Sequence, residues 1–474
     1  MSLVLLFAVV LFSLRHFIFC HDCCRRSASC TAPINSETKV VKSIFVKTQT
    51  AKKVSVKNYL SLNQYSSLIK CICVAFLLGA FTSSALAKPV VIGYVPAFRA
   101  MAATIDATDL TLVTHINISF LNPDASGALI KNDAMLCMPN AAGASTTASD
   151  LRYVINKAHQ ANVKVLVSVA GGVIPSCSGD WNTLLHTANR QAFVDSLIKF
   201  VDDFNLDGLD VDLEGDVLTK IDKAGDYTPF IQALSTQLKT RNKLLSCATA
   251  SYEGGMIPVA SIPYFDYVNI MSYDTIGPSW GKPGVEHSTY AQAVSDVNLW
   301  KSRGLSQEKL VLGVPFYGYG FGTYAANYSF KEILEKLGNE NGDKDVIGTA
   351  CANCNYVTYN GLSTIKSKTH LALQNGAGVM IWELSQDATG SFSLLKAINT
   401  EIQQASGSAD SSSSNSESSS VKSSSSASSV ATASDTPQSK KSGGSFDLES
   451  LLLLILIGIF LPLCLRKNSL RKKR

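Results

Sequence analysis

Short apolar runs of strand length recur along residues 90–384, and segments with helical spacing of apolar positions separate them. The runs are Val90–Pro96, His115–Leu121, Val163–Val169, Leu206–Leu213, Leu244–Ser251, Tyr267–Tyr273, Lys309–Phe316 and Gly378–Leu384. Three- and four-residue steps relate Phe193, Val194, Leu197, Ile198, Val201 and Phe204 before the fourth run, and Phe230, Ile231, Leu234 and Leu238 after it. Eight strands alternating with helices predict one α/β domain, a closed parallel (β/α)8 TIM barrel.

The fourth run carries three carboxylates at alternate positions. Asp210, Asp212 and Glu214 share one face of the strand because side chains alternate across it, and the other face is purely apolar. Burying three acids is costly, so such a row indicates a function and not a contribution to stability. Coupled carboxylates also push their pKa values apart. The pattern predicts acid catalysis with Glu214 at the C-terminal end of the strand, where such barrels carry active sites. The alternative, a helix-capping or surface acid run, is disfavoured by the surrounding strands.

The segment Asp207–Glu214 reads D-G-L-D-V-D-L-E and matches every fixed position of the pattern D-G-x-D-x-D-x-E. Other segments agree in order and spacing on the third, sixth, seventh and eighth strands: Lys164–Ser168, Met271–Asp274, Gly313–Gly318 and Trp382–Glu383. On these residues the chain resembles glycoside hydrolase family 18, the chitinase family, over nearly all of residues 90–400.

Two segments depart from the family pattern. The family's third strand usually ends in Ser-x-Gly-Gly, whereas this chain reads Ser168-Val169-Ala170-Gly171-Gly172, so we expect a shifted or less open backbone there. Many members carry an α+β insertion between the seventh and eighth strands, which forms one wall of a deep groove. Only residues 318–376 are available for it, so we expect a TIM barrel without a full chitinase insertion domain, with that wall reduced or absent.

The resemblance implies a retaining, substrate-assisted hydrolysis of β-1,4-N-acetylglucosamine linkages, in which the sugar's 2-acetamido oxygen is the nucleophile. It implies that Glu214 protonates the glycosidic oxygen and later deprotonates water. Asp212 is expected to bind the acetamido N–H and stabilise an oxazolinium intermediate, while Asp210 holds the proton balance of Asp212. Tyr273 is expected to donate its hydroxyl to the acetamido carbonyl oxygen.

The resemblance also implies a set of substrate-binding residues. They are Asp274, Trp382, Met271, Tyr94, Ser168, Trp280 and Trp181. Trp382 is expected to form the floor beneath the distorted sugar, with packing in the barrel core as its alternative. Ser168 is expected to hydrogen-bond within the carboxylate network. Trp181 and Trp280 fall in loops, where they either stack on neighbouring sugars or pack within the loops.

Neither a metal nor an organic cofactor is predicted. The seven histidines show no zinc-like pairing, and Cys351 and Cys354 form a solitary C-x-x-C. In an oxidising compartment two disulfides are expected, one joining Cys137 to Cys177 and one joining Cys351 to Cys354. Cys247, within a strand, is expected to be a buried free thiol.

The N-terminal extension predicts export. Residues 70–87 combine a basic lead, an apolar core and the A-x-A site Ala85-Leu86-Ala87, as a secretory signal requires. About seventy residues precede it, so we expect translation to begin within residues 54–62. The competing interpretation is a membrane anchor at Leu3–Leu14, which is short for a span of about 20 residues. The catalytic barrel is expected to cover residues 88–405.

The C-terminal part is predicted to be a targeting segment. Residues 406–445 form a serine-rich flexible linker that includes Gly443-Gly444, and residues 446–474 hold an apolar run and a basic tail. This trio resembles GlyGly carboxy-terminal sorting signals, processed during transport to the surface or medium. The alternative is a permanent membrane anchor on a serine stalk. We therefore expect a secreted or surface protein, exported through the inner membrane, that meets secretion and C-terminal processing machinery.

The net negative charge of residues 88–465 argues against nucleic-acid binding by the predicted barrel. Residues 88–465 hold 26 Lys and Arg against 35 Asp and Glu, so the overall charge of +5 comes from the targeting segments. The expected function is a chitinase acting as a monomer on chitin or N-acetylglucosamine oligosaccharides, cutting inside chains because the groove wall is reduced. The alternatives are an endo-β-N-acetylglucosaminidase on glycoprotein or peptidoglycan glycans and a non-catalytic, lectin-like chitin-binding barrel.

Overall fold

Parallel strands close into a barrel in the order β1-β15-β10-β9-β8-β7-β6-β2. Their bounds are β1 Val90–Pro96, β2 His115–Leu121, β6 Lys164–Ala170, β7 Gly208–Asp212, β8 Leu244–Thr249, β9 Tyr267–Ile270, β10 Leu310–Pro315 and β15 Gly378–Trp382. The computed structural model describes residues 88–411, so the predictions for residues 1–87 and 412–474 lie outside it. Each predicted apolar run coincides with one barrel strand, which confirms the TIM barrel.

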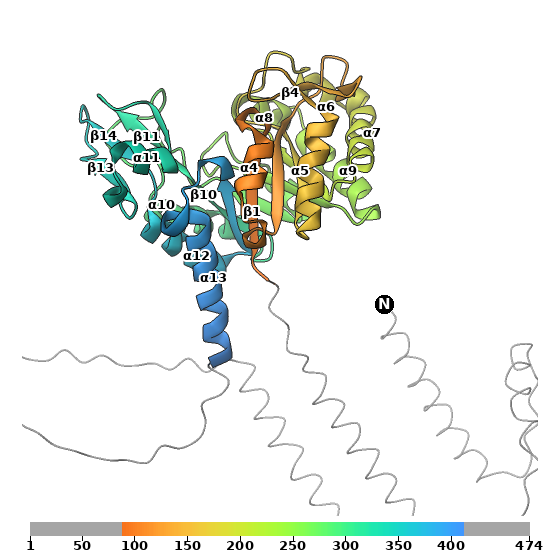
Figure 1. Ribbon diagram of the computed structural model, residues 1–474. Helices are drawn as coiled ribbons and strands as arrows, with labels where there is room; N and C mark the ends of the chain where they lie inside the picture. Colours follow the sequence, from red (N-terminus) through yellow and green to blue (C-terminus); the bar gives the residue numbers. More distant parts are fainter. Residues whose placement is uncertain (1–87, 412–474) are drawn as a thin grey trace, which may run out of the picture. The chain divides into compact units, whose positions relative to one another are not determined.

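Helices cover the outside of the barrel (Figure 1). They are α4 Met101–Ala107, α5 Ala148–Gln160, α6 Trp181–Leu185, α7 Thr187–Asp203, α8 Gly215–Lys223, α9 Tyr227–Thr240, α10 Tyr290–Ser302, α12 Leu362–Asn375 and α13 Leu394–Ser411. The predicted apolar stripes of α7 and α9 are buried against the strands, and each fully buried Leu or Phe contributes about 1.5–3 kcal/mol. Between β8 and β9 the crossover is a 3-10 helix, Val259–Tyr264, in place of an α-helix.

Strand β7 sorts its side chains as the alternating pattern predicts. Leu209, Val211 and Leu213 are buried in the main hydrophobic core. Asp210 pairs in register with Ser168 of β6 and with Ser246 of β8, so two hydroxyl-bearing residues flank it inside the barrel. The strand therefore delivers its acids to the barrel interior and its C-terminal mouth.

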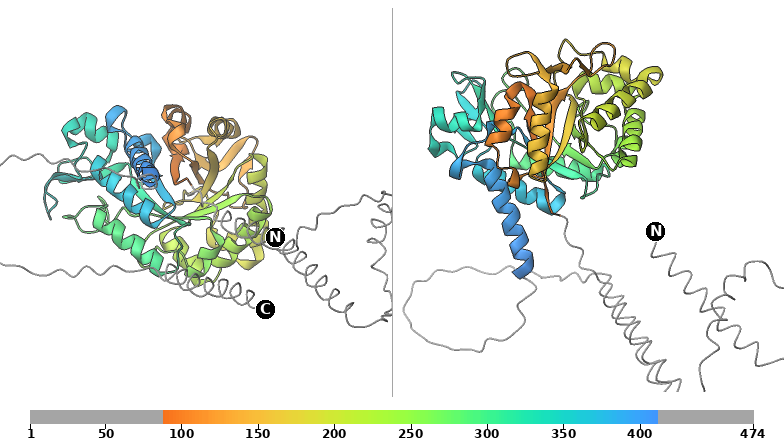
Figure 2. Two further views of the ribbon diagram at one scale, coloured as in Figure 1. Left: turned by 90° about the horizontal axis from the view of Figure 1, so that it is seen from below. Right: turned by 45° about the vertical axis from the view of Figure 1, so that its right-hand side comes forward.

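Two small sheets are inserted into the barrel. One consists of β3 Ile130–Lys131, β4 Ala134–Pro139 and β5 Ser145–Thr147. The other lies between β10 and β15 and has the order β12-β11-β14-β13, with β11 Tyr317–Phe321, β12 Asn327–Ser329, β13 Val346–Gly348 and β14 Tyr356–Thr358, together with α11 Phe330–Leu337. Figure 2 shows this second sheet on the flank of the barrel away from α7 and α9. A wall is therefore present at this position, as one small sheet and one helix, and its reduced size relative to the family stays a prediction.

The cysteines of the barrel pair as predicted. Disulfides join Cys137 to Cys177 and Cys351 to Cys354, with Cα atoms 5.5 and 5.2 Å apart. Cys247 is a buried free thiol. Within residues 88–411 no helix is long and apolar enough to cross a membrane.

Candidate active site

A cavity of about 270 Å³ opens at the C-terminal end of the barrel strands. Strands β1, β2, β6, β7, β8, β9 and β15 and the segments that follow them supply its lining. The lining residues are Tyr94, Phe98, Phe120, Gly172, Val173, Asp212, Glu214, Ala248, Met271, Tyr273, Asp274, Met380 and Trp382. The barrel closure thus gathers residues from distant parts of the chain. Two of the three β7 acids reach this cavity.

Asp210, the third acid, is fully buried and hydrogen-bonded beneath the cavity. Its Oδ2 accepts from Tyr94 Oη at 2.6 Å and from Ser168 Oγ at 2.7 Å. Its Oδ1 accepts from Ser246 Oγ at 2.6 Å and from Asn269 Nδ2 at 3.4 Å. Burial raises the pKa of Asp210, and these hydrogen bonds oppose the rise. Asp210 therefore lies beneath the cavity, held by four hydrogen-bond donors, and is absent from the cavity lining.

Asp212 and Glu214 form the acid pair of the cavity. Burial, followed by the charges of Glu214 and Asp210, raises the pKa of Asp212 well above its usual value. Burial and the negative charge of Asp274 raise the pKa of Glu214 to about 7. The pair therefore holds a proton at neutral pH. Asp212 Oδ1 is buried and has no hydrogen-bond partner within the described residues, which leaves one acceptor free for a ligand donor.

Glu214 keeps the strand alternation although β7 ends two residues earlier. Its backbone is extended, with φ −126° and ψ 165°, so its side chain stays on the face of Asp212. The backbone at the end of β6 makes room for it, because a Cβ on Gly172 would lie 2.6 Å from Glu214 Oε1. Ala170, which stands where the family pattern has glycine, adopts a φ of 76° in the left-handed region.

The turn after β9 places a tyrosine and a third carboxylate at the cavity. Tyr273 Oη lies 3.7 Å from Met380 Sδ and has no shorter hydrogen bond within residues 88–411. Asp274 has a φ of 63°, and its Oδ1 accepts from Tyr317 Oη at 2.5 Å. Burial and the charge of Asp274 raise the pKa of Tyr273 well above its usual value. Tyr273 is therefore a neutral hydroxyl donor that faces the acid pair.

Aromatic rings form the floor and sides of the cavity. Trp382 stacks on Phe120 with ring centroids 5.6 Å apart, and Tyr94 meets Trp382 edge-on at 5.3 Å. Met271 also lines the cavity. A flat indole beside two acids suits the C–H face of a pyranose ring.

Two predicted substrate-binding residues, Trp181 and Ser168, do not line the cavity, although Ser168 does hydrogen-bond within the carboxylate network as predicted. Trp181 is only 2% exposed: it begins α6, its ring packs edge-on against Phe193, and its indole N–H donates to Asn122 Oδ1 at 2.9 Å. It is therefore a core residue. Ser168 is fully buried behind Asp210, which places it among the supports of that carboxylate and away from the cavity.

Trp280 occupies a different position from the other predicted aromatic residues. Its side chain is 44% exposed, its indole N–H donates to the Asp274 carbonyl oxygen at 3.1 Å, and its ring contacts Tyr319. It lies beside the turn that carries Asp274 and is absent from the cavity lining. An exposed ring there is free to meet a bound chain beyond the cavity.

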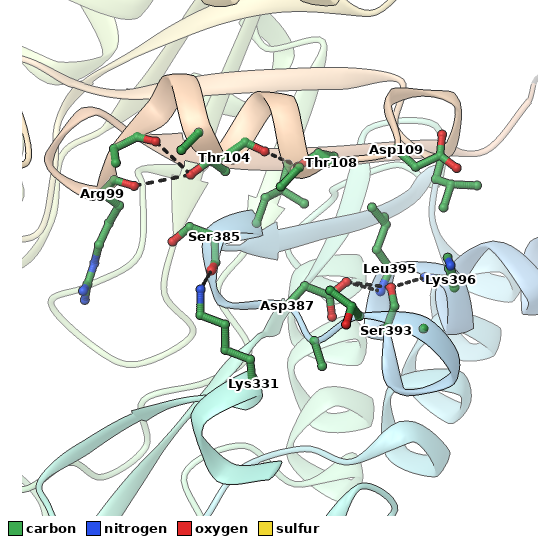
Figure 3. Close-up of a pocket in the computed structure, with 18 of the residues that line it drawn as sticks. Arg99, Thr104, Thr108, Asp109, Lys331, Ser385, Asp387, Ser393, Leu395 and Lys396 are labelled. Atoms are coloured by element: carbon green, nitrogen blue, oxygen red, sulfur yellow. Dashed lines mark hydrogen bonds between the residues drawn. The ribbon is translucent and has the colours of Figure 1, made fainter. Parts of the chain in front are cut away.

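Sequence reasoning missed Phe98, which follows β1 and is 40% exposed. Its ring lines the cavity described above and also a second hollow of about 790 Å³. Figure 3 shows this second hollow between α4 and the segment after β15, with Arg99, Ser385 and Lys331 at one end. The two hollows adjoin at Phe98. The sequence offers only an aromatic residue two positions after the first strand; its exposure is visible in the structure alone.

Within the described part of the chain, no group of three His, Cys, Asp or Glu side chains is placed to hold a metal ion. The polar groups of the cavity include three carboxyls and the phenols of Tyr94 and Tyr273.

A parallel barrel with a proton-holding carboxyl pair and an aromatic floor at its C-terminal mouth defines a glycoside hydrolase. The model of glycosyl hydrolases family 18 matches residues 90–387, and the chain belongs to that family. It is 24% identical over 438 residues to chitinase A1 of Niallia circulans, covering 71% of this chain and 62% of that one. It is 28% identical over 353 residues to chitinase 63 of Streptomyces plicatus, covering 61% and 56%. The chain thus spans less than two thirds of the length of these relatives.

Solved structures agree with this assignment. The fold is similar to that of the family 18 chitinase ChiB from the chitin utilization locus of Flavobacterium johnsoniae, with 35% identity and a TM-score of 0.57. That match covers 67% of this chain and 95% of the other. A chitinase from Bacteroides thetaiotaomicron is 29% identical with a TM-score of 0.55, covering 67% of this chain and 97% of that one.

Proposed function

We propose that this protein is a chitinase that hydrolyses β-1,4-linked N-acetylglucosamine chains with retention. The observation that carries the proposal is the acid pair over the Trp382 floor, in which Glu214 holds a proton near neutral pH and Asp212 Oδ1 has no partner within residues 88–411. Such a pair can protonate a leaving oxygen and accept a hydrogen bond from an acetamido N–H. The chitinase relatives support chitin as the substrate.

The first step breaks the glycosidic bond. Glu214 donates its proton to the glycosidic oxygen as the acetamido oxygen of the sugar above Trp382 attacks its own anomeric carbon. Asp212 Oδ1 accepts the acetamido N–H and stabilises the positive oxazolinium ring, and Tyr273 Oη donates to the acetamido oxygen before it attacks. The leaving chain departs with the proton of Glu214.

The second step restores the sugar. Glu214, now a carboxylate, takes a proton from water as the water oxygen attacks the anomeric carbon from the side that the leaving chain occupied. The bond from the anomeric carbon to the acetamido oxygen breaks, and the product keeps the original anomeric configuration. The hydroxyl donors hold Asp210 in place throughout, and the charge of Asp210 contributes to the raised pKa of Asp212.

The same proposal covers mode of attack and location. The reduced wall formed by β11–β14 and α11 supports an open cleft that cuts inside chains. The Cys137–Cys177 disulfide supports an oxidising, exported environment, in agreement with the signal-like residues 70–87. The C-terminal sorting tail remains a proposal that rests on residues outside the described range.

The test is hydrolysis of a soluble N-acetylglucosamine hexamer by residues 88–405, beside a Glu214→Gln variant, with the anomer of the new reducing end read by NMR. A β product that the variant does not make supports the proposal. Binding without cleavage by the wild type would instead indicate a lectin-like protein. If the wild type neither cleaves nor binds the hexamer, glycoprotein or peptidoglycan glycans become the substrates to test. Accumulation of disaccharide alone from the first time points would contradict the endo mode.

A further inference from the structure

Lys368, on α12, is a fully buried lysine outside the catalytic cavity. Its ammonium group donates to Ser288 O at 3.0 Å, Ser288 Oγ at 2.6 Å and Asn360 Oδ1 at 2.8 Å. These three acceptors match the three ammonium protons, and none of them is a carboxylate. Burying a cation without an ion-pair partner is costly, so a role beyond simple volume filling is expected.

The hydrogen bonds of Lys368 lead to the turn that carries Tyr273 and Asp274. Ser288 Oγ accepts from Lys368 and itself donates to the Ser272 carbonyl oxygen at 2.7 Å. The Thr275 N–H donates to the His287 carbonyl oxygen at 3.1 Å. These two hydrogen bonds join the two ends of the segment 272–288. Lys368, on α12, binds Ser288 at one of these ends.

The same segment sets the surroundings of Asp274. The buried His287 ring lies with Nδ1 3.5 Å from Asp274 Oδ1, and the ring centroids of Tyr317 and Tyr319 lie 5.3 and 5.1 Å from it. The His287 N–H donates to Thr358 Oγ1 of β14 at 3.2 Å. A shift of the segment at Ser288 would therefore move the groups behind Asp274.

We propose that Lys368 is a positioning residue for the reaction: through Ser288 and Ser272 it fixes where Tyr273 Oη and the Asp274 carboxylate stand relative to the acid pair. The inference rests on the role given to Tyr273 in the proposed function and on the Asp274 charge that raises the pKa of Glu214. A flexible side chain with three donors can tie one backbone carbonyl, one hydroxyl and one amide together, which an apolar residue of similar volume cannot do. Burial lowers the pKa of Lys368 to about 7, and the nearby charges of Asp345, Asp296 and Glu286 oppose this.

The variants are Lys368→Met and Ser288→Ala, with Lys301→Met as the matched control. Lys301 is an exposed lysine of α10 that donates to Asn375 Oδ1 and contacts neither the turn nor the cavity. For the hexamer, kcat should fall about 10- to 100-fold, as a displacement of about 1 Å can cause, while KM changes less because the sugar still rests on Trp382. The control should keep both constants.

A pH profile separates positioning from a general loss of folded protein. The charge of Asp274 raises the pKa of Glu214, so an Asp274 that moves away lets this pKa fall. Glu214 then loses its proton at lower pH, and the alkaline limb of kcat/KM should shift to lower pH in both variants. If Lys368→Met does not fold, Ser288→Ala tests the proposal by itself, because it removes only a single hydroxyl and should still fold. A folded Ser288→Ala with wild-type kcat and wild-type limb would overturn the proposal.

A crystal structure of Ser288→Ala keeps this inference separate from the proposed function. If the wild-type enzyme does not cleave the hexamer, the proposed function fails, and the distance from Asp274 Oδ1 to Tyr317 Oη still tests the positioning. A lengthening from 2.5 Å, or a displaced Tyr273, supports the inference. An unchanged turn refutes it.

Discussion

Tyr94 Oη donates a 2.6 Å hydrogen bond to Asp210 Oδ2, although the two residues are 116 positions apart in the sequence. The bond runs across the barrel interior from β1 to β7, and both side chains are almost completely buried. Burial and the nearby carboxylates raise the pKa of Tyr94 well above its usual value, so it remains a neutral donor. Tyr94 therefore supports the carboxylate beneath the acid pair with the same side chain that lines the cavity.

Replacing Tyr94 by Phe should lower both stability and activity. The substitution removes one donor from a buried carboxylate, which should cost about 1.5–3 kcal/mol of unfolding free energy. A displaced Asp210 also changes the charge that helps to raise the pKa of Asp212, so kcat should fall. Chemical denaturation and hexamer kinetics measure the two effects. Tyr153→Phe is the control, because Tyr153 donates to the exposed Asp106 and should change neither quantity much. Equal losses in both variants would contradict the assignment.

The activity should have an alkaline limb near pH 7 that depends on Asp274. Glu214 must be protonated to act as the acid, and its pKa is about 7, so kcat/KM should fall as the pH rises through that value. Asp274→Asn removes the charge that raises this pKa, and the limb should move to lower pH. Asn can still accept the Tyr317 hydroxyl. Asp216→Asn, in the first turn of α8, removes an exposed charge that has no such effect and should leave the limb in place. The same shift in both would exclude a specific role for Asp274.

Gly172→Ala should inactivate the enzyme with little effect on the rest of the barrel. The added Cβ would lie 2.6 Å from Glu214 Oε1, so the carboxyl must move away from its place above Asp212. A displacement of about 1 Å can reduce the rate about 10²-fold. Gly342→Ala is the control: its Cβ would meet the ring of Phe392, which does not line the cavity. Activity and melting temperature should separate the two variants. Full activity in Gly172→Ala would show that Glu214 has room to reposition.

The architecture and the acid row were predictable from local patterns. Strand alternation places Asp210, Asp212 and Glu214 on one face and apolar residues on the other, and the periods of α7 and α9 mark the faces that pack on the barrel. These signals depend on neighbours within a few residues. They can therefore be read from the sequence without knowledge of the tertiary structure.

The remaining features depend on contacts between distant segments. Trp181 fills a core site because Asn122 supplies an acceptor for its indole, and nothing near Trp181 in the sequence shows this. The cluster of Lys368, Ser288 and Ser272 joins residues almost one hundred positions apart, and its members resemble ordinary helix and loop residues. Phe98 can be recognised as a candidate binding residue only from the structure, in which it lines two adjoining hollows.

Phe98→Ala should weaken the binding of long substrates selectively. Phe98 follows β1, which neighbours β15 with Trp382, whereas Glu214 follows β7 on the far side of the barrel. With a sugar on Trp382 and the leaving chain on the side of Glu214, we expect the hollow past Phe98 to lie on the non-reducing side. An exposed aromatic ring there can stack on a further sugar.

The measurement is KM for N-acetylglucosamine oligomers of increasing length. In Phe98→Ala, KM should rise about 10-fold for oligomers that place a second sugar on this side, consistent with the loss of about 0.5–1.5 kcal/mol from ring contacts together with buried apolar area. The shortest cleaved substrate should be affected least. Tyr153→Phe is again a suitable control, because Tyr153 lies on α5 and lines neither hollow. A rise in KM that is the same at every length would place Phe98 in the wall of the catalytic cavity alone.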